Sequence, residues 1–127
     1  MSESEDKNKL LNIPQRVYLV INSQVFPLKK EITSLGRKLD NDLVLQDALV
    51  SRYHAEIKYV DGRFTIYDLD STSGTFLNNK KIKKSILYSG DLILLANIPI
   101  MFIDESGSLE SDADKTTGRK KRHSPQK

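Results

Sequence analysis

The side chains best suited to chemistry lie in three polar segments of the chain. The first contains Gly36 and Arg37, the second contains Ser51, and the third is a run of hydroxyl residues that includes Thr72 and Ser73. A guanidinium fork matches the geometry of a phosphate group, and hydroxyl and backbone donors can complete a pocket around it. A glycine before the arginine would let the backbone turn sharply. Together the segments predict phosphate binding by Arg37, Ser51 and Thr72, although each alone also fits an ordinary strand connection.

Two other kinds of site fit these regions less well. Ser51 and His54 resemble a nucleophile and its base, but no third acidic group is evident, and the spacing suits a histidine that braces loop backbone. Asp68 and Asp70 lack the alternating oxygen ligands of a calcium loop, so turn and strand-end roles explain them better. We therefore expect no catalytic residue, no metal site, no cofactor and no enzymatic activity.

The composition indicates one domain with polar ends. The chain has 127 residues, of which 38% are hydrophobic, with a net charge of +3 and no cysteine, so a reducing cytosol is permitted. No apolar run approaches the ~20 residues of a membrane span, and no signal peptide is evident. We expect a disordered arm over residues 1–13, a folded domain over 14–104 and a disordered basic tail over 105–127. The expected location is cytoplasmic, or nuclear in a eukaryote.

Short apolar or alternating runs separated by turn residues fill the central region. The strongest hairpin signal is Asp61-Gly62, because a type I′ turn needs the positive φ that glycine tolerates. No period near 3.6 residues persists for long, so little helix is expected. The pattern predicts an all-β sandwich of ten or eleven short strands. The expected strands are 17–21, 25–28, 32–35, 43–45, 54–60, 63–69, 75–77, 80–84, 86–88, 92–95 and 98–103.

Several motifs occur in the order of a known family. The segment GRKLDNDLVLQDALVSRYHAEI is followed by DLDSTSGTFLNNKKI and then by SGDLILLAN. This order resembles the forkhead-associated (FHA) domain pattern of Gly-Arg, Ser-x-x-His, Ser-Thr before Asn-Gly-Thr, and a late Gly-Asp, over roughly residues 17–103. The resemblance implies an FHA/SMAD-like sandwich of two antiparallel sheets. It also implies a module that binds phosphothreonine peptides through loops at one end.

The resemblance assigns a role to each matching residue. Arg37, Ser51 and Thr72 match the residues that hold the phosphate. Contacts with the rest of the peptide are implied for Arg52, Ser73 and Leu49, and loop bracing is implied for Gly36, His54, Gly74 and Asn78.

Ser73 is the clear departure from the family pattern, which has asparagine there. Serine is shorter and offers fewer hydrogen-bonding groups, so we expect weaker or less selective peptide binding. The apolar Leu49 indicates no acidic preference at the third residue after the phosphothreonine.

The expected partner is a phosphothreonine-containing protein or peptide, bound by a monomeric adaptor in Ser/Thr kinase signalling. The tail threonines Thr116 and Thr117 precede the basic segment GRKKRH, so the tail is a candidate internal ligand. Lys80–Lys84 is expected to be a solvated hairpin, or otherwise to widen the positive field around the site. No membrane partner is expected, and nucleic acid is disfavoured. The alternative function is a scaffolding or nucleic-acid-associated module that uses the basic tail.

Overall fold

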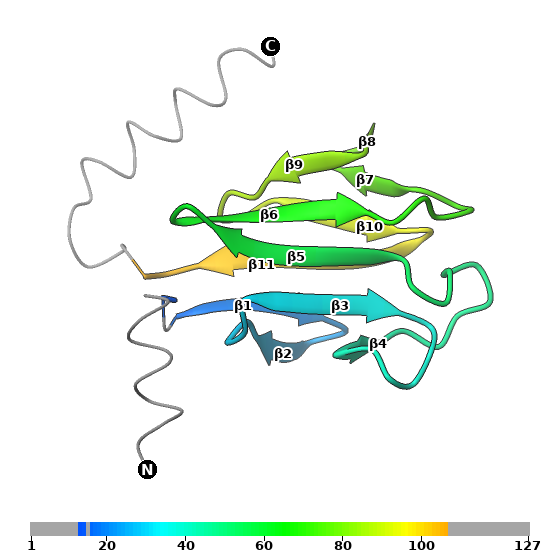
Figure 1. The fold of residues 1–127 in the computed structure, drawn as a ribbon, viewed down its shortest axis with the longest axis horizontal. Coiled ribbons are helices and arrows are strands. Elements are labelled where there is room, and N and C mark those ends of the chain that lie inside the picture. The colour runs from blue at the N-terminus through cyan, green and yellow to red at the C-terminus, as the bar shows by residue number, and fades with distance from the viewer. Residues whose placement is uncertain (1–12, 15, 107–127) are drawn as a thin grey trace.

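The computed structural model describes residues 13–14 and 16–106, which form two packed β-sheets (Figure 1). The strands are β1 (Val17–Ile21), β2 (Gln24–Pro27), β3 (Ile32–Gly36), β4 (Leu43–Val44), β5 (Ala55–Val60), β6 (Arg63–Asp68), β7 (Thr75–Leu77), β8 (Lys80–Ile82), β9 (Lys84–Ile86), β10 (Leu92–Leu95) and β11 (Ile98–Asp104). One sheet has the order β2-β1-β11-β10-β7-β8, and the other has the order β4-β3-β5-β6-β9. The predicted all-β sandwich is confirmed, and no described residue is helical. Accordingly, this part of the chain contains no helix with the length and apolar character needed to cross a membrane.

Alternating side chains of both sheets build one apolar core. In β10 the inward residues Ile93 and Leu95 are fully buried, whereas their neighbours are only partly buried. Removing such a side chain from water stabilises the fold by about 1.5–3 kcal/mol. The two sheets meet where Phe64 of β6 contacts Phe102 of β11, with ring centroids 5.7 Å apart. The core therefore makes a rigid frame from which the loops project.

The hairpin prediction at Asp61-Gly62 agrees with the structure. The two residues have φ values of 52° and 78°, and they connect β5 directly to β6. Positive φ at both turn positions is the type I′ pattern that matches the twist of the flanking strands. Asn22-Ser23 between β1 and β2, and Asn78-Asn79 between β7 and β8, also have positive φ at both positions.

Lys80–Lys84 does not form the expected hairpin. β8 pairs with β7 in the six-stranded sheet, whereas β9 pairs with β6 in the five-stranded sheet. Lys83 alone links the two strands, so this segment is a corner at which the chain changes sheets. The expected strand over 86–88 is instead centred earlier, at β9. Local alternation could not reveal the change of sheet, because both strands are short and exposed at their lysines.

Two further features differ from the simplest reading of the sequence. β4 pairs with β3 in parallel, so the five-stranded sheet is not wholly antiparallel. Ile13, which the sequence placed in the N-terminal arm, is buried in the core at 8% exposure. An apolar side chain this close to the first strand gains more from the core than from solvent.

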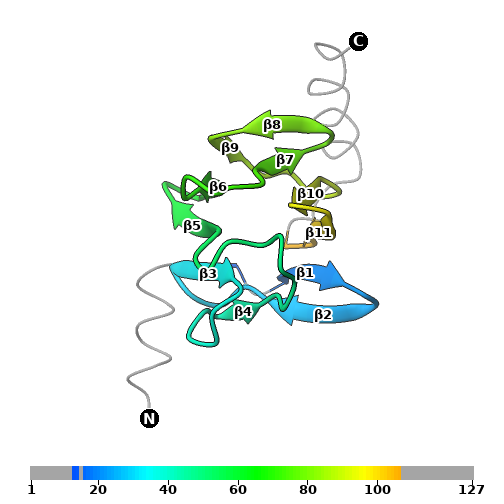
Figure 2. The ribbon, with the colours of Figure 1, turned by 90° about the vertical axis from the view of Figure 1, so that its right-hand side faces the viewer.

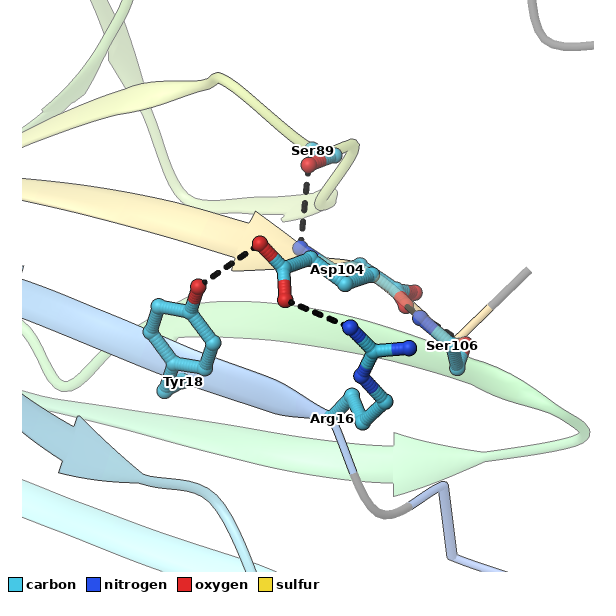
Figure 3. A network of polar contacts seen from close by, with 6 residues as sticks. Arg16, Tyr18, Ser89, Asp104 and Ser106 are labelled. Atoms are coloured by element: carbon cyan, nitrogen blue, oxygen red, sulfur yellow. Dashed lines mark hydrogen bonds and ion pairs between the residues drawn. The ribbon is translucent and has the colours of Figure 1, made fainter. Parts of the chain in front are cut away.

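The two ends of the described chain are joined by polar contacts (Figure 3). Tyr18 donates a hydrogen bond from its hydroxyl to Glu105 Oε2 at 2.9 Å, and Arg16 lies 3.4 Å from Glu105 Oε1. The backbone N–H of Asp104 donates to Ser89 Oγ at 2.9 Å. Glu105, which the sequence placed in the tail, thus contacts the domain. The predicted tail from residue 107 onward, with Thr116 and Thr117, lies outside the described residues.

Candidate functional site

Three loops meet at one end of the sandwich, which we call the site pole and which faces the viewer in Figure 2. They are the β3–β4 loop, the β4–β5 loop and the β6–β7 loop; the opposite end, the far pole, carries the β5–β6 turn and the β9–β10 loop (Figure 1). An open pocket at the site pole is lined by Arg37, Ser51, Arg52, Tyr53, Leu69 and Thr72. The structure therefore brings together the three residues expected to hold a phosphate.

Arg37 is oriented by the β4–β5 loop. Its Nε donates to the carbonyl oxygen of Val50 at 2.9 Å, and its backbone N–H donates to the carbonyl oxygen of Ser51 at 3.0 Å. Because Nε is engaged, the terminal nitrogens of the exposed guanidinium carry the donors that remain for a ligand. The side chain is thus held in place before any anion binds.

Gly36 allows a close approach between two loops. A Cβ at this position would lie 2.2 Å from the carbonyl oxygen of Arg52 and 2.8 Å from Asn41 Nδ2. Gly36 ends strand β3, the chain bends directly after it at Arg37, and the φ of Gly36 is not positive. The reason for glycine here is steric: a carbonyl of the β4–β5 loop occupies the space of a side chain.

Ser51 connects the β4–β5 and β6–β7 loops. Its Oγ accepts a hydrogen bond from the backbone N–H of Thr72 at 3.1 Å. Because the hydroxyl acts as acceptor here, its own hydrogen is left to donate to a ligand. Thr72 is exposed beside it, and the described residues supply no partner to its hydroxyl.

His54 is fully buried and connects the β4–β5 loop to the β6–β7 loop from the side of the core. Its Nδ1 accepts from the backbone N–H of Ser51 at 3.1 Å, and its Nε2 lies 2.9 Å from the carbonyl oxygen of Gly74. The first contact requires a bare Nδ1, so the proton resides on Nε2 and is donated to Gly74. Both ring nitrogens are thereby committed to loop backbone, which leaves neither available as a base for Ser51.

The β6–β7 loop folds around the carboxylate of Asp68. Ser71 Oγ donates to Asp68 Oδ1 at 2.5 Å and Thr75 Oγ1 donates to the same oxygen at 2.7 Å. Ser71 Oγ also accepts from the N–H of Gly74 at 3.0 Å. Partial burial acts to raise the pKa of Asp68, but the hydrogen bonds from Ser71 and Thr75 outweigh it and hold the pKa below its ordinary value. The ionised carboxylate therefore orders the loop that presents Thr72.

The remaining predicted site residues occupy different places. Arg52 lines the pocket and is exposed, whereas Leu49 and Ser73 are not among the pocket-lining residues. Gly74 has a φ of 91° and receives the His54 contact. Asn78 lies at the end of β7 away from the pocket, where it bonds Asp91 and the backbone of Leu92. It braces the β7–β8 turn against β10, and not the three loops.

Three residues of the site were not singled out from the sequence. Tyr53 and Leu69 line the pocket, and Tyr53 donates to the carboxylate of Asp40 at 2.8 Å. Their adjacency to the matched motifs was the available signal. Asn41 is 7% exposed and donates from Nδ2 to the carbonyl oxygens of Lys38 and Arg52 at 2.9 Å each. The sequence indicated only a turn there, since no local pattern reveals that its partner lies in another loop.

Known proteins are similar to this chain in sequence and architecture. The FHA domain model matches residues 33–96, which is half of the chain. The chain is 33% identical over 93 residues to the glycogen accumulation regulator GarA of Mycobacterium tuberculosis, covering 73% of this chain and 56% of GarA. It thus spans about half the length of the curated relatives that it matches.

Two solved structures are similar in both sequence and fold. Mycobacterium tuberculosis EmbR, in complex with a low-affinity phosphopeptide, is 33% identical with a TM-score of 0.67, covering 68% of this chain and 24% of that one. A structure from a study of phosphothreonine-dependent FHA domain interactions is 31% identical with a TM-score of 0.66, covering 69% of this chain and 95% of that one. The family model over half of the chain, the 33% identity to GarA and the sandwich fold lead to one conclusion: the chain belongs to the FHA domain family and is a phosphothreonine-binding module.

Proposed function

We propose that this domain binds a phosphothreonine segment of a partner protein and acts as an adaptor in Ser/Thr kinase signalling. One observation carries the proposal: Arg37, Ser51 and Thr72, which come from three loops, line a single open pocket. A phosphothreonine carries about −1.5 to −2 charges at neutral pH and offers strong acceptor oxygens. The pocket supplies the guanidinium of Arg37 for this charge, and the hydroxyls of Ser51 and Thr72 as donors to the phosphate oxygens.

Each of the three residues has a distinct task in this proposal. The terminal nitrogens of Arg37 bind two phosphate oxygens side by side, because Nε is already held by Val50. The hydroxyl of Ser51 donates to a third oxygen while accepting from Thr72 N–H. The Thr72 hydroxyl closes the other side of the pocket. Each charge-assisted hydrogen bond is worth about 1.5–3 kcal/mol, so these contacts give useful affinity after the entropy of binding is subtracted.

Leu69 offers an explanation for a preference for phosphothreonine over phosphoserine. It is an exposed apolar residue that lines the same pocket. The additional methyl group of phosphothreonine would lie against it, worth about 0.8 kcal/mol when a group of that size is buried. Equal affinity for matched phosphothreonine and phosphoserine peptides would remove this role.

Ser73 bears on selectivity for the rest of the peptide. It follows Thr72 in the loop but is not among the pocket-lining residues, and it has fewer hydrogen-bonding groups than asparagine. We expect Ser73→Asn to tighten binding to the peptide backbone, measured as a lower Kd with the same phosphopeptide. An unchanged Kd would show that this position contributes nothing here.

Calorimetric titration with a phosphothreonine peptide tests the function. The wild type should bind the phosphorylated peptide and not its unphosphorylated form. Arg37→Ala should weaken binding by about 100-fold or more, since two charge-assisted bonds are lost. Arg63→Ala removes an exposed cation at the far pole and should leave the affinity unchanged. Retained affinity in a folded Arg37→Ala variant, or equal binding of both peptide forms, would contradict the proposal.

A further inference from the structure

A cluster of lysines lies beside the β6–β7 loop, on the corner where the chain changes sheets. Lys80 and Lys81 belong to β8, Lys83 is the link, and Lys84 begins β9; all four are exposed. We call these residues the lysine corner. In Figure 2, β7 and β8 lie on one side of the site pole, across from β3 and β4.

Backbone contacts fix the lysine corner against the β6–β7 loop. The carbonyl oxygen of Lys83 accepts from the backbone N–H of Asp68 at 2.8 Å, and Asp68 is the carboxylate around which the loop folds. The register pairs Ile82 with Thr75, so β8 ends level with the end of the loop. Lys83 therefore sits at the root of the loop that carries Thr72.

Lys81 reaches the same loop through its side chain. Its Cε would lie 3.2 Å from a Cβ built on Gly74, and Lys81 pairs with Phe76 in the β7–β8 ladder. The aliphatic stem thus passes over Gly74, two residues after Thr72, while the residue as a whole remains exposed. Lys81 therefore contributes an exposed cation next to the β6–β7 loop.

The positive charge of the corner is weakly compensated. Lys83 lies 3.9 Å from Asp70, but their side chains are 82% and 98% exposed, so water screens this pair strongly. Lys84 lies over the ring of Tyr67, with 5.9 Å between Nζ and the ring centroid, which leaves its charge in place. On the other side of Arg37 the charges are mixed, because Asp40 and Asp47 line the adjoining depression.

From these placements we propose that Lys81 and Lys83 form a second subsite, which binds acidic side chains of the phosphorylated partner next to its phosphothreonine. The inference rests on the proposed function and adds a preference to it. A peptide that places its phosphate on Arg37 and crosses the β6–β7 loop passes the two ammonium groups. Acidic side chains of the peptide are attracted to these ammonium groups, and this attraction is independent of the contacts in the phosphate pocket.

An acidic peptide fits this pole better than a nucleic acid. A nucleic acid carries regularly spaced phosphates and needs an extended positive groove. Asp40 and Asp47 interrupt such a path on one side of Arg37, and Asp70 interrupts it at the loop. A peptide can place its acidic residues on one side only, which matches the uneven distribution of charge.

Four phosphothreonine peptides of one length and sequence test the proposal. Two carry glutamates either before or after the phosphothreonine, and two carry glutamines at the same positions. For one of the two sides, the wild type should bind the glutamate peptide about three- to tenfold more tightly than its glutamine match. The ratio should fall toward one as salt increases, because exposed pairs are screened.

The double variant Lys81→Gln/Lys83→Gln should reduce this ratio to about one while still binding both peptides. Glutamine keeps part of the stem over Gly74, and the Lys83 contact with Asp68 is made by the backbone. The control Lys29→Gln/Arg63→Gln removes the same charge from exposed positions near the far pole and should preserve the ratio.

Comparing ratios separates the outcomes. No preference for glutamate in the wild type, or a preference that survives in the Lys81→Gln/Lys83→Gln variant, overturns the subsite and leaves phosphothreonine binding intact. Failure of the wild type to bind any of the phosphopeptides refutes the proposed function itself. A labelled single-stranded DNA forms a further arm: binding that the double variant abolishes, without any change in the peptide ratio, would assign the lysine corner to nucleic acid instead.

Discussion

The two poles of the sandwich are built in different ways. At the site pole, side chains of one loop bond the backbone of another: Arg37 to Val50, Asn41 to Arg52, and His54 to Gly74. At the far pole, the tight turn Asp61-Gly62 connects β5 to β6 by local backbone conformation, and Ser89 of the β9–β10 loop accepts from the N–H of Asp104 in β11. Long loops lose more entropy on ordering than tight turns, so they require these additional bonds to hold one conformation.

Glycines show the same contrast. Gly62 at the far pole has a φ of 78°, and beyond its two chain neighbours no atom lies within 4 Å of a Cβ placed on it. Gly36 at the site pole has ordinary φ, but a Cβ would overlap the carbonyl oxygen of Arg52. One glycine serves local backbone conformation and the other serves contact between loops. The pole that we propose as the ligand site is therefore the one that depends on long-range packing.

The largest expected effect compares these two glycines. Gly36→Ala should lower the free energy of unfolding by about 1–3 kcal/mol or more, because the Arg52 carbonyl cannot move without breaking its bonds to Asn41 and Lys38. It should also weaken phosphopeptide binding. Gly62→Ala should cost about 1–2 kcal/mol through backbone strain alone and leave binding unchanged. Chemical denaturation and titration measure both; weakened binding in Gly62→Ala with unaffected binding in Gly36→Ala would reverse the comparison.

Serines at the two poles provide the second comparison. Ser51→Ala removes a donor to phosphate and leaves the N–H of Thr72 without its acceptor, so the Kd should rise about tenfold. Ser89→Ala removes the acceptor for the N–H of Asp104 at the far pole and should not change the Kd. Calorimetric titration of both variants with one phosphopeptide is the measurement. Equal effects would mean that the Ser51 hydroxyl does not meet the ligand.

Acid should weaken the site pole through Asp68. Its folded pKa lies below the ordinary 3.8, so its stabilising effect is complete above pH 3.8 and is lost as the pH falls through the folded value. The stability difference between wild type and Asp68→Asn should be constant near neutral pH and should shrink below pH 3.8. Thermal unfolding followed by circular dichroism across this range provides the check. A stability difference that grows in acid would contradict a lowered pKa of Asp68 in the folded state.

The smallest expected effect is a loss of stability in alkali through the hydrogen bond of Tyr18 to Glu105 at the far pole. The hydrogen bond to Glu105 is the main cause that raises the pKa of Tyr18 above 10.0, so this bond stabilises below pH 10.0 and is lost as the pH rises through the folded value. Tyr18→Phe should lower the Tm slightly near neutral pH, and the difference should vanish in strong alkali. Phosphopeptide affinity should stay unchanged at neutral pH. A loss of affinity would show that the two poles are coupled.

Most of the fold could be predicted because strand formation is encoded locally. The bounds of β1, β7 and β10 agree with the expected 17–21, 75–77 and 92–95, and alternation or dense apolar character marks each of them. The sheet change at Lys83 could not be predicted, since it depends on which strands pair and not on local pattern. The parallel pairing of β4 with β3 could not be predicted for the same reason.

The candidate site was predicted in its chemistry and only partly in its geometry. Residue type together with motif order and the family resemblance pointed to Arg37, Ser51 and Thr72, because a chain with 20 lysines and arginines offers many cations that could meet a dianion. Asn78 matched the family motif, yet it bonds Asp91 near the other end of β7. Asn41 and Tyr53 had no recognisable signal of their own, since their partners, the carbonyl of Arg52 and the carboxylate of Asp40, lie in a different loop from each.

By itself the amino-acid sequence determined that the chain forms short strands, that polar loops separate them, and that these loops contain guanidinium and hydroxyl groups. These properties follow from neighbouring residues, and neighbours are what a sequence displays. Only the tertiary structure decided that three distant loops share one pocket, that the carbonyl of Arg52 fills the place of a side chain at Gly36, and that lysines of a sheet corner contact the β6–β7 loop at Asp68 and Gly74. Such placements depend on how the two sheets pack, and packing energy is shared by residues far apart along the chain.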